Sequence, residues 1–185
     1  MRMRCLADTA GLLRQDERER VEVAMHRFTR RFPQLFIAIH TGTLDDVAEL
    51  REYGFWLLNR AIFVDKPVET HNAAGILITI DPEFKVAGMT FGYLLDPFFE
   101  ETDTFDCLSR AHSHWLEGRY ADGMIKALDQ TFQVLRKRCR RAWHHPDRFK
   151  HKGMPLSKAG DWVGGARQGP QRTSEARQVQ AEEMS

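Results

Sequence analysis

The chain has 185 residues, of which 42% are hydrophobic and 29% charged, with a formal net charge of +1. This composition excludes a fibrous or a wholly disordered chain and favours a globular protein. No apolar run approaches the roughly 18 residues of a membrane-spanning helix, and no signal-peptide core follows the first arginines. Cys5, Cys107 and Cys139 are widely spaced and form no CxxC, which argues against a disulfide framework or a zinc knuckle. We therefore expect a cytoplasmic protein without a transmembrane segment.

The first half of the chain predicts a helix, a strand and a second helix. Residues 15 to 31 repeat apolar side chains on one helical face, and Pro33 ends this helix. The apolar run 35 to 39 is typical of a central strand that is covered on both faces. Residues 43 to 61 begin with a cap-like Thr-x-x-Asp and continue with apolar residues at helical spacing. This order of strand and then helix suits a parallel crossover.

The second half predicts a hairpin followed by two helices. Strands at 75 to 80 and 85 to 91 flank a short turn at 81 to 84, so they pair as antiparallel neighbours. Helices are expected at about 103 to 116 and 121 to 139. These elements predict an α/β fold with a small mixed sheet and flanking helices.

Apolar periodicity stops near Trp143, and Gly, Pro, Ser, Gln and charged residues dominate the rest of the chain. Such a segment buries too little apolar surface to offset its ordering entropy. We expect one domain at 6 to 141, and a basic and then polar C-terminal tail at 142 to 185 that is disordered alone.

The net charge conceals two opposite runs. Residues 81 to 106 hold seven carboxylates and one lysine, a net charge of about −6. Residues 136 to 152 hold eight Lys or Arg and one Asp, a net charge of about +7, with three histidines interleaved. The basic run could bind a polyanion or fold against the acidic run.

Four stretches, in this order, resemble a known family, the TPM domain. They are Leu6-Ala7-Asp8-Thr9-Ala10-Gly11-Leu12-Leu13; the strand 35 to 39 with Leu44-Asp45-Asp46 and Tyr53; the hairpin from Gly75 into Gly92-Tyr93-Leu94-Leu95-Asp96; and Gly118-x-Tyr120-x-x-Gly123. The resemblance spans about residues 6 to 138. It implies a Rossmann-like α/β/α sandwich around a mixed sheet. It also implies divalent-metal binding, and acid phosphatase activity as in a plant member.

The chain departs from the family pattern at two places. Ala73-Ala74-Gly75 stands where the family usually has Asp-Asn-Gly, so an acidic side chain that would help to hold a metal is missing. In the family's Gly-Tyr-Gly-Leu-Glu segment, Leu94 replaces the second glycine and Asp96 the glutamate. We therefore expect a degraded metal site and a loop of different shape after the hairpin.

The candidate metal ligands are carboxylates at strand ends and at the family's opening: Asp8, Asp45, Asp46 and Asp96. Calcium or magnesium would take such oxygen ligands, polarise a phosphoryl group and activate water. The alternative is structural, because Asp46 suits a helix cap and Asp8 suits a turn.

The candidate polyanion-binding residues are basic and lie at the end of the last predicted helix: Arg136, Lys137, Arg138, Arg140 and Arg141. Together with Trp143 and Phe149 they could contact nucleic-acid phosphates or an anionic membrane surface. The alternatives are that they complement the negative end of their helix, or pair with the acidic run at 81 to 106.

Three functions follow, and the sequence favours the first, because the acidic site is degraded and no other catalytic group is visible. The first is a non-catalytic interaction or ligand-binding module with an unknown protein partner. The second is a divalent-metal-dependent acid phosphatase, a phosphomonoesterase. The third is a polyanion-binding adaptor that uses the basic arm 136–152.

Overall fold

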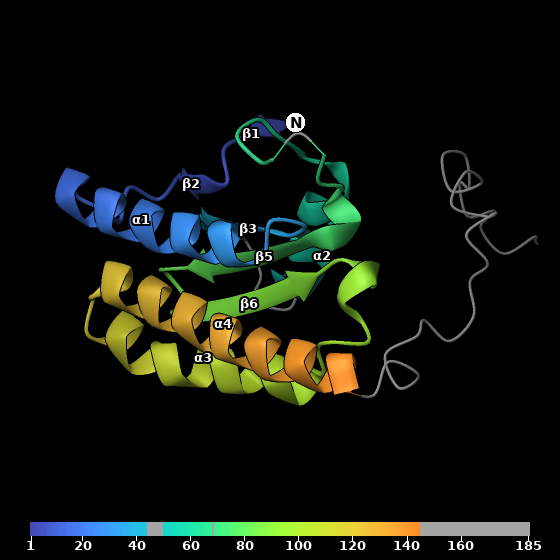
Figure 1. Ribbon diagram of the computed structural model, residues 1–185. Helices are drawn as coiled ribbons and strands as arrows, with labels where there is room; N and C mark the ends of the chain where they lie inside the picture. Colours follow the sequence, from blue (N-terminus) through green and yellow to red (C-terminus); the bar gives the residue numbers. More distant parts are fainter. Residues whose placement is uncertain (44–49, 68, 145–185) are drawn as a thin grey trace, which may run out of the picture. The chain divides into compact units, whose positions relative to one another are not determined.

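The computed structural model describes residues 1–43, 50–67 and 69–144 (Figure 1). Residues 145–185, most of the predicted tail, lie outside the described residues. So does the predicted start of the second helix, with Asp45 and Asp46.

A four-stranded mixed sheet forms the centre of the fold, in the order β2-β3-β5-β6. Its strands are β2 (Leu6–Asp8), β3 (Phe36–Thr41), β5 (Gly75–Asp81) and β6 (Val86–Phe91). The first three are parallel, and β6 runs antiparallel to β5. β3 and β5 are buried along their whole length, as expected for strands covered on both faces. The short strands β1 (Arg2–Met3) and β4 (Ile62–Phe63) form a separate parallel pair.

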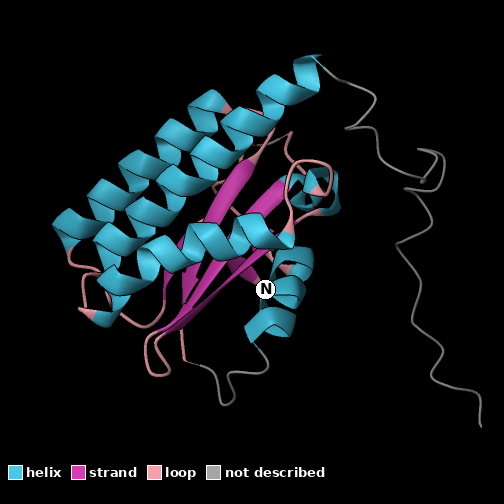
Figure 2. Ribbon diagram, turned by 90° about the horizontal axis from the view of Figure 1, so that it is seen from below, coloured by secondary structure: helices cyan, strands magenta, loops and turns pink. Residues whose placement is uncertain are grey.

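Helices cover both faces of the sheet (Figures 1 and 2). α2 (Leu50–Arg60) packs on β5 and β6 on one side. On the other side lie α1 (Gln15–Arg31), α3 (Glu101–Leu116) and α4 (Tyr120–His144), with α4 packed against both α1 and α3. Two 3-10 turns, η2 (Asn72–Ala74) and η3 (Tyr93–Leu95), precede β5 and follow β6. The predicted α/β fold with its small mixed sheet is confirmed.

Hydrogen bonds with nearby side chains explain where α1 begins and where β5 turns into β6. In α1, Val21, Met25 and Phe28 are buried on one face, and the N–H of Arg14 donates to Glu17 at the helix start. In the β5–β6 hairpin, Asp81 Oδ1 accepts the N–H groups of Glu83 and Phe84. This arrangement is an Asx-type turn, the chemistry that favours aspartate at the start of a tight connection.

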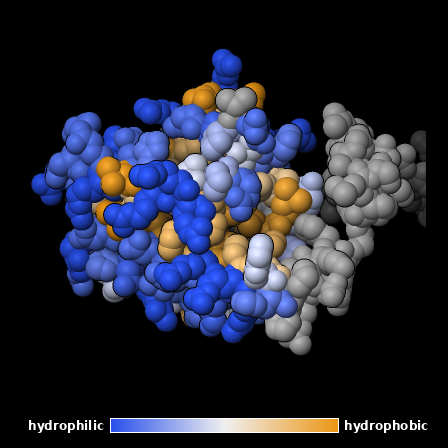
Figure 3. Space-filling model, in the orientation of Figure 1, coloured by the Kyte–Doolittle hydropathy of each residue, from blue (hydrophilic) through white to orange (hydrophobic). Residues whose placement is uncertain are grey.

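The outer face of the α1 and α4 layer is mainly hydrophilic, with apolar patches between the charged side chains (Figure 3). This is the expected surface of amphipathic helices whose apolar stripes face a core. Among the described residues, no helix is both long and apolar enough to cross a bilayer.

Candidate functional site

Asp8 ends β2, and its almost completely buried carboxylate, 1% exposed, is occupied by protein donors. Oδ1 accepts the Leu12 N–H at 3.0 Å and the Thr41 hydroxyl at 2.6 Å. Oδ2 accepts the Leu13 N–H at 3.0 Å and lies 3.5 Å from Arg18 Nη2. Burial raises the pKa of Asp8, but the hydrogen bonds and Arg18 outweigh burial and lower the pKa below its usual value. Asp8 therefore ties the turn before α1 to the end of β3.

His40 lies one residue before the end of β3 and is paired with Tyr53 of α2. The Tyr53 hydroxyl lies 3.5 Å from His40 Nε2, and the ring centroids are 5.5 Å apart. Burial lowers the pKa of His40 and raises the pKa of Tyr53, so both groups are neutral at neutral pH. The pair therefore carries no positive charge that would attract a phosphate group.

Asp96 lies at the opposite end of the sheet from Asp8. Asp8 pairs with Thr41, and Thr41 with Ile80, at the carboxyl ends of the parallel strands. Asp96 follows Phe91, which pairs with Ile76 near the start of β5, because β6 runs antiparallel. The structure therefore does not bring Asp8 and Asp96 together.

The described residues do not fit a calcium or magnesium site. They contain no group of three His, Cys, Asp or Glu side chains that could hold a metal ion. A hard cation needs six to eight oxygen ligands, and the oxygens of Asp8 already accept hydrogen bonds. Asp45 and Asp46 lie outside the described residues, so their predicted role stays a prediction.

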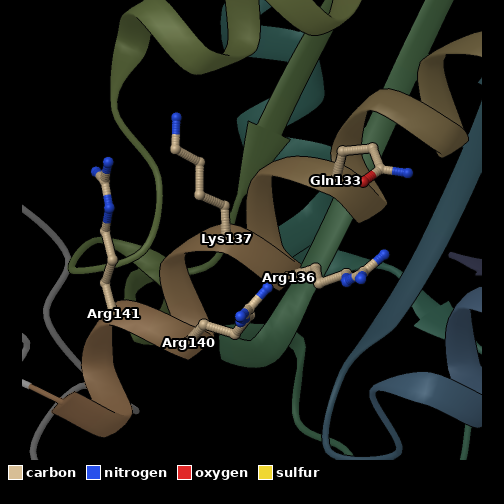
Figure 4. A pocket seen from close by; sticks show the side chains of 5 residues that line it. All are labelled: Gln133, Arg136, Lys137, Arg140 and Arg141. Carbon is tan, nitrogen blue, oxygen red and sulfur yellow. The ribbon is translucent and has the colours of Figure 1, made fainter.

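A cluster of cationic side chains lies toward the C-terminal end of α4. Gln133, Arg136, Lys137, Arg140 and Arg141 line an open depression of about 430 Å³ (Figure 4). Their spacing of three or four residues places them on one helical face, and the four cationic side chains are exposed. We call Arg136, Lys137, Arg140 and Arg141 the basic face of α4.

The cations of the basic face have no acidic partner within the described part of the chain. The end of α1 adds positive charge near Cys139 of α4. Burial raises the pKa of Cys139 on α4, and the charge of Arg31 on α1 opposes that shift, which shows that Arg31 is near. Unpaired cations on one surface repel each other, and a bound anion removes this repulsion.

Arg138 differs from the other predicted polyanion-binding residues, because its charge is neutralised inside the molecule. Its Nη1 lies 3.0 Å from Glu100 Oε1 and its Nη2 lies 2.9 Å from Asp103 Oδ2. Asp103 also accepts the Glu100 N–H at the start of α3. The expected pairing of the basic and acidic runs therefore occurs, but through Arg138.

We expect Arg138→Gln to lower the free energy of unfolding by about 1 kcal/mol, because the Arg138 and Asp103 side chains are 20% and 18% exposed and their pair is only partly screened. Urea denaturation at neutral pH measures this change. Arg141→Gln removes the same charge from the exposed basic face, and should change stability by less than about 0.5 kcal/mol. Equal losses in the two variants would contradict the pairing.

Sequence reasoning identified the basic residues but did not find Gln133 beside them or Arg31 near Cys139. It also grouped Arg138 with the exposed cations. Arg138 is two residues from both Arg136 and Arg140, an offset of about 200° on a helix, which points to nearly opposite sides. That offset was the available signal; the position of Arg31 depends on how α1 packs on α4.

Comparison with known proteins supports the fold. No family model matches the chain, and no curated protein does. The N-terminal domain of a P. gingivalis protein is similar in structure, with a TM-score of 0.56 and 20% identity over 72% of this chain and 83% of that one. The N-terminal domain of cg2496 from Corynebacterium glutamicum is also similar, with a TM-score of 0.54 and 10% identity over 71% of this chain and 79% of that one.

A third similar structure is the BA42 protein of the psychrophilic bacterium Bizionia argentinensis, with a TM-score of 0.55 and 12% identity over 68% of this chain and 83% of that one. At these identities the similarity shows a shared fold and carries no site residue across. The α/β arrangement therefore recurs in these solved domains.

Proposed function

We propose that the chain is a non-catalytic binding module of the TPM type that takes polyanions through the basic face of α4. The observation that carries the proposal is the set of four exposed cations around one depression, without acidic partners among the described residues. Phosphate-rich ligands gain affinity from such a surface by releasing condensed counterions. Membership of the TPM family rests on the four sequence stretches and is consistent with the shared fold.

A non-catalytic role is favoured because the described candidates for chemistry are already engaged in structural contacts. Asp8 accepts the hydrogen bonds of the turn before α1, His40 is buried and Tyr53 partly buried, and both of these rings are neutral. A metal-dependent acid phosphatase, a cytoplasmic location and a partner protein stay predictions that no observation favours further.

The test compares two double variants with the same loss of charge. We expect Arg136→Gln/Arg140→Gln to bind immobilised inorganic polyphosphate about tenfold more weakly than wild type at low salt. The slope of log affinity against log salt should become shallower by about 2, one unit for each lost contact. Biosensor titrations of the full chain over a series of salt concentrations give both quantities.

Arg60→Gln/Lys126→Gln is the matched control, since both side chains are exposed and lie outside the basic face. It should keep most of the wild-type affinity. Equal weakening of the two double variants would show that only net charge matters. Wild-type protein that does not bind polyphosphate would contradict the proposal altogether.

A further inference from the structure

The end of α4 projects beyond the helix that it packs against. Arg138 pairs with Glu100 and Asp103 at the N-terminus of α3, so these residues are at the same level. α4 continues for six residues to His144, which is about 9 Å of helix at 1.5 Å per residue. The projecting part carries Arg140, Arg141 and Trp143.

Trp143 is 85% exposed, the largest exposure among the large hydrophobic residues described. It lies three residues after Arg140 and seven after Arg136, the spacing of neighbours along one side of a helix. At about 100° per residue, the basic face and Trp143 fall within an arc of about 160°. Leu135, which is buried, lies outside this arc, so the arc is the outward side of α4.

We infer that the basic face docks on an anionic membrane surface, with Trp143 entering the headgroup region. This inference rests on the proposed function and names its ligand. Clusters of four or more Lys or Arg on an amphipathic helix attract anionic headgroups. Tryptophan is enriched at membrane interfaces because its ring is apolar while its N–H stays hydrated. Long basic side chains extend their charged ends toward the headgroups from the same helix.

The aromatic content of the described end of α4 favours a membrane over a single-stranded nucleic acid. The five described residues that line the depression all lie on α4, and the depression is open to solvent (Figure 4). Single-stranded nucleic acids are bound in grooves where several aromatic rings stack successive bases. Between Arg136 and His144, the described end of α4 carries one Phe, Tyr or Trp ring, that of Trp143.

The ion pairs of Arg138 reduce the negative charge next to the proposed membrane-binding surface. Glu100, 64% exposed, and Asp103 lie beside the docking end of α4 and would repel anionic lipid. Arg138 neutralises part of this negative charge without using a cation of the basic face. The four cations of the basic face therefore stay without an acidic partner among the described residues.

The experiment measures binding of the full chain to vesicles of phosphatidylcholine with phosphatidylserine, and to vesicles of phosphatidylcholine alone, by co-sedimentation. We expect salt-sensitive binding to the first and almost none to the second. Arg140→Gln/Arg141→Gln should bind about thirtyfold more weakly, about fivefold for each lost charge. Circular dichroism of each variant confirms that it folds.

The variant Trp143→Ala distinguishes binding to a membrane from electrostatic binding to any polyanion. It should weaken binding to the phosphatidylserine vesicles about tenfold, but binding to polyphosphate by less than about twofold. A labelled single-stranded RNA forms the comparison arm. Spectral shift and quenching by brominated lipid, present in wild type and reduced in Trp143→Ala, report insertion of the ring directly.

The outcomes distinguish this inference from the proposed function. Binding to polyphosphate or RNA without binding to anionic vesicles would overturn the membrane inference and leave the proposed function standing. An equal loss of RNA and vesicle binding in Trp143→Ala would also overturn it, because the ring would then serve any polyanion. If the wild-type protein bound neither polyphosphate, RNA nor anionic vesicles, both the membrane inference and the proposed function would be overturned.

Discussion

Gly92→Ala is expected to lower the free energy of unfolding by about 3 kcal/mol, because an added methyl group has no space. A Cβ on Gly92 would overlap the carbonyl group of Ala73 and lie 2.6 Å from the carbonyl oxygen of Asn72. Both neighbours are backbone atoms, which cannot turn away as a side chain can. The φ of Gly92 is −72°, so the need for glycine here comes from close approach and not from a left-handed conformation.

Hydrogen bonds and packing hold the backbone of η2 and the backbone at Gly92 together. The Asn72 side chain donates to the carbonyl oxygens of Leu58 and Ala61 at 2.8 and 2.9 Å, which anchors η2 to the end of α2. The Gly92 N–H donates to Gly75 at 2.9 Å, and Leu95 in the following turn is 2% exposed. A shift large enough to admit the methyl group would break these contacts, so the strain stays in the folded state.

Gly88→Ala on β6 is the matched control for urea denaturation. Both variants change the unfolded chain equally, so the difference between them isolates the steric effect. A Cβ on Gly88 would meet only side chains, 3.1 Å from Thr79 Oγ1 and 3.5 Å from Leu50, which can adjust. We expect a change within about 1 kcal/mol. A loss in Gly92→Ala no larger than that in Gly88→Ala would contradict the packing of η3 on η2.

The long elements of this fold could be predicted from the sequence, because each repeats its pattern several times. The predicted helix 15–31 is α1, and the predicted strands 75–80 and 85–91 are β5 and β6 within one residue at each end. β1, β2 and β4 were not predicted, since two or three residues cannot display a period. Their pairing partners lie far away in the chain.

The candidate site could be predicted in part, for a similar reason. A run of arginine and lysine is visible in the sequence, but which cation is paired depends on where α3 begins relative to α4. Arg138 meets Glu100 and Asp103 only because the two helices pack antiparallel. Likewise, nothing local to Gly92 shows that Ala73 lies against it. Charge and periodicity are local properties, whereas neutralisation and steric space depend on tertiary packing.

Asp8→Ala is expected to lower the free energy of unfolding by about 3 kcal/mol at neutral pH. The buried carboxylate accepts the N–H groups of Leu12 and Leu13 and the Thr41 hydroxyl, and Arg18 lies beside it. The alanine variant leaves these donors without their acceptor. Asp8→Asn keeps one oxygen acceptor but no charge, so we expect about half of this loss.

The contribution of Asp8 should also depend on pH, with a sign fixed by its lowered pKa. The folded protein holds the pKa of Asp8 below its unfolded value of 3.8, so the unfolded chain binds the proton more readily. The stabilisation is therefore complete above about pH 5, and is lost as the pH falls through the unfolded and then the folded pKa. Urea denaturation of wild type and Asp8→Asn along a pH series should show their difference shrinking at acid pH.

Asp129→Asn is the control for this series, because Asp129 is exposed on α4 and its removal should cost less than about 0.5 kcal/mol. A wild-type advantage over Asp8→Asn that stays constant down to acid pH would show that the charge of Asp8 contributes nothing. A cation that bound at Asp8 would have to displace Arg18 or one of the three hydrogen-bond donors from its carboxylate. Calcium should therefore not raise the stability of the wild-type protein through Asp8, and a calcium-dependent stabilisation lost in Asp8→Asn would return this residue to the metal hypothesis.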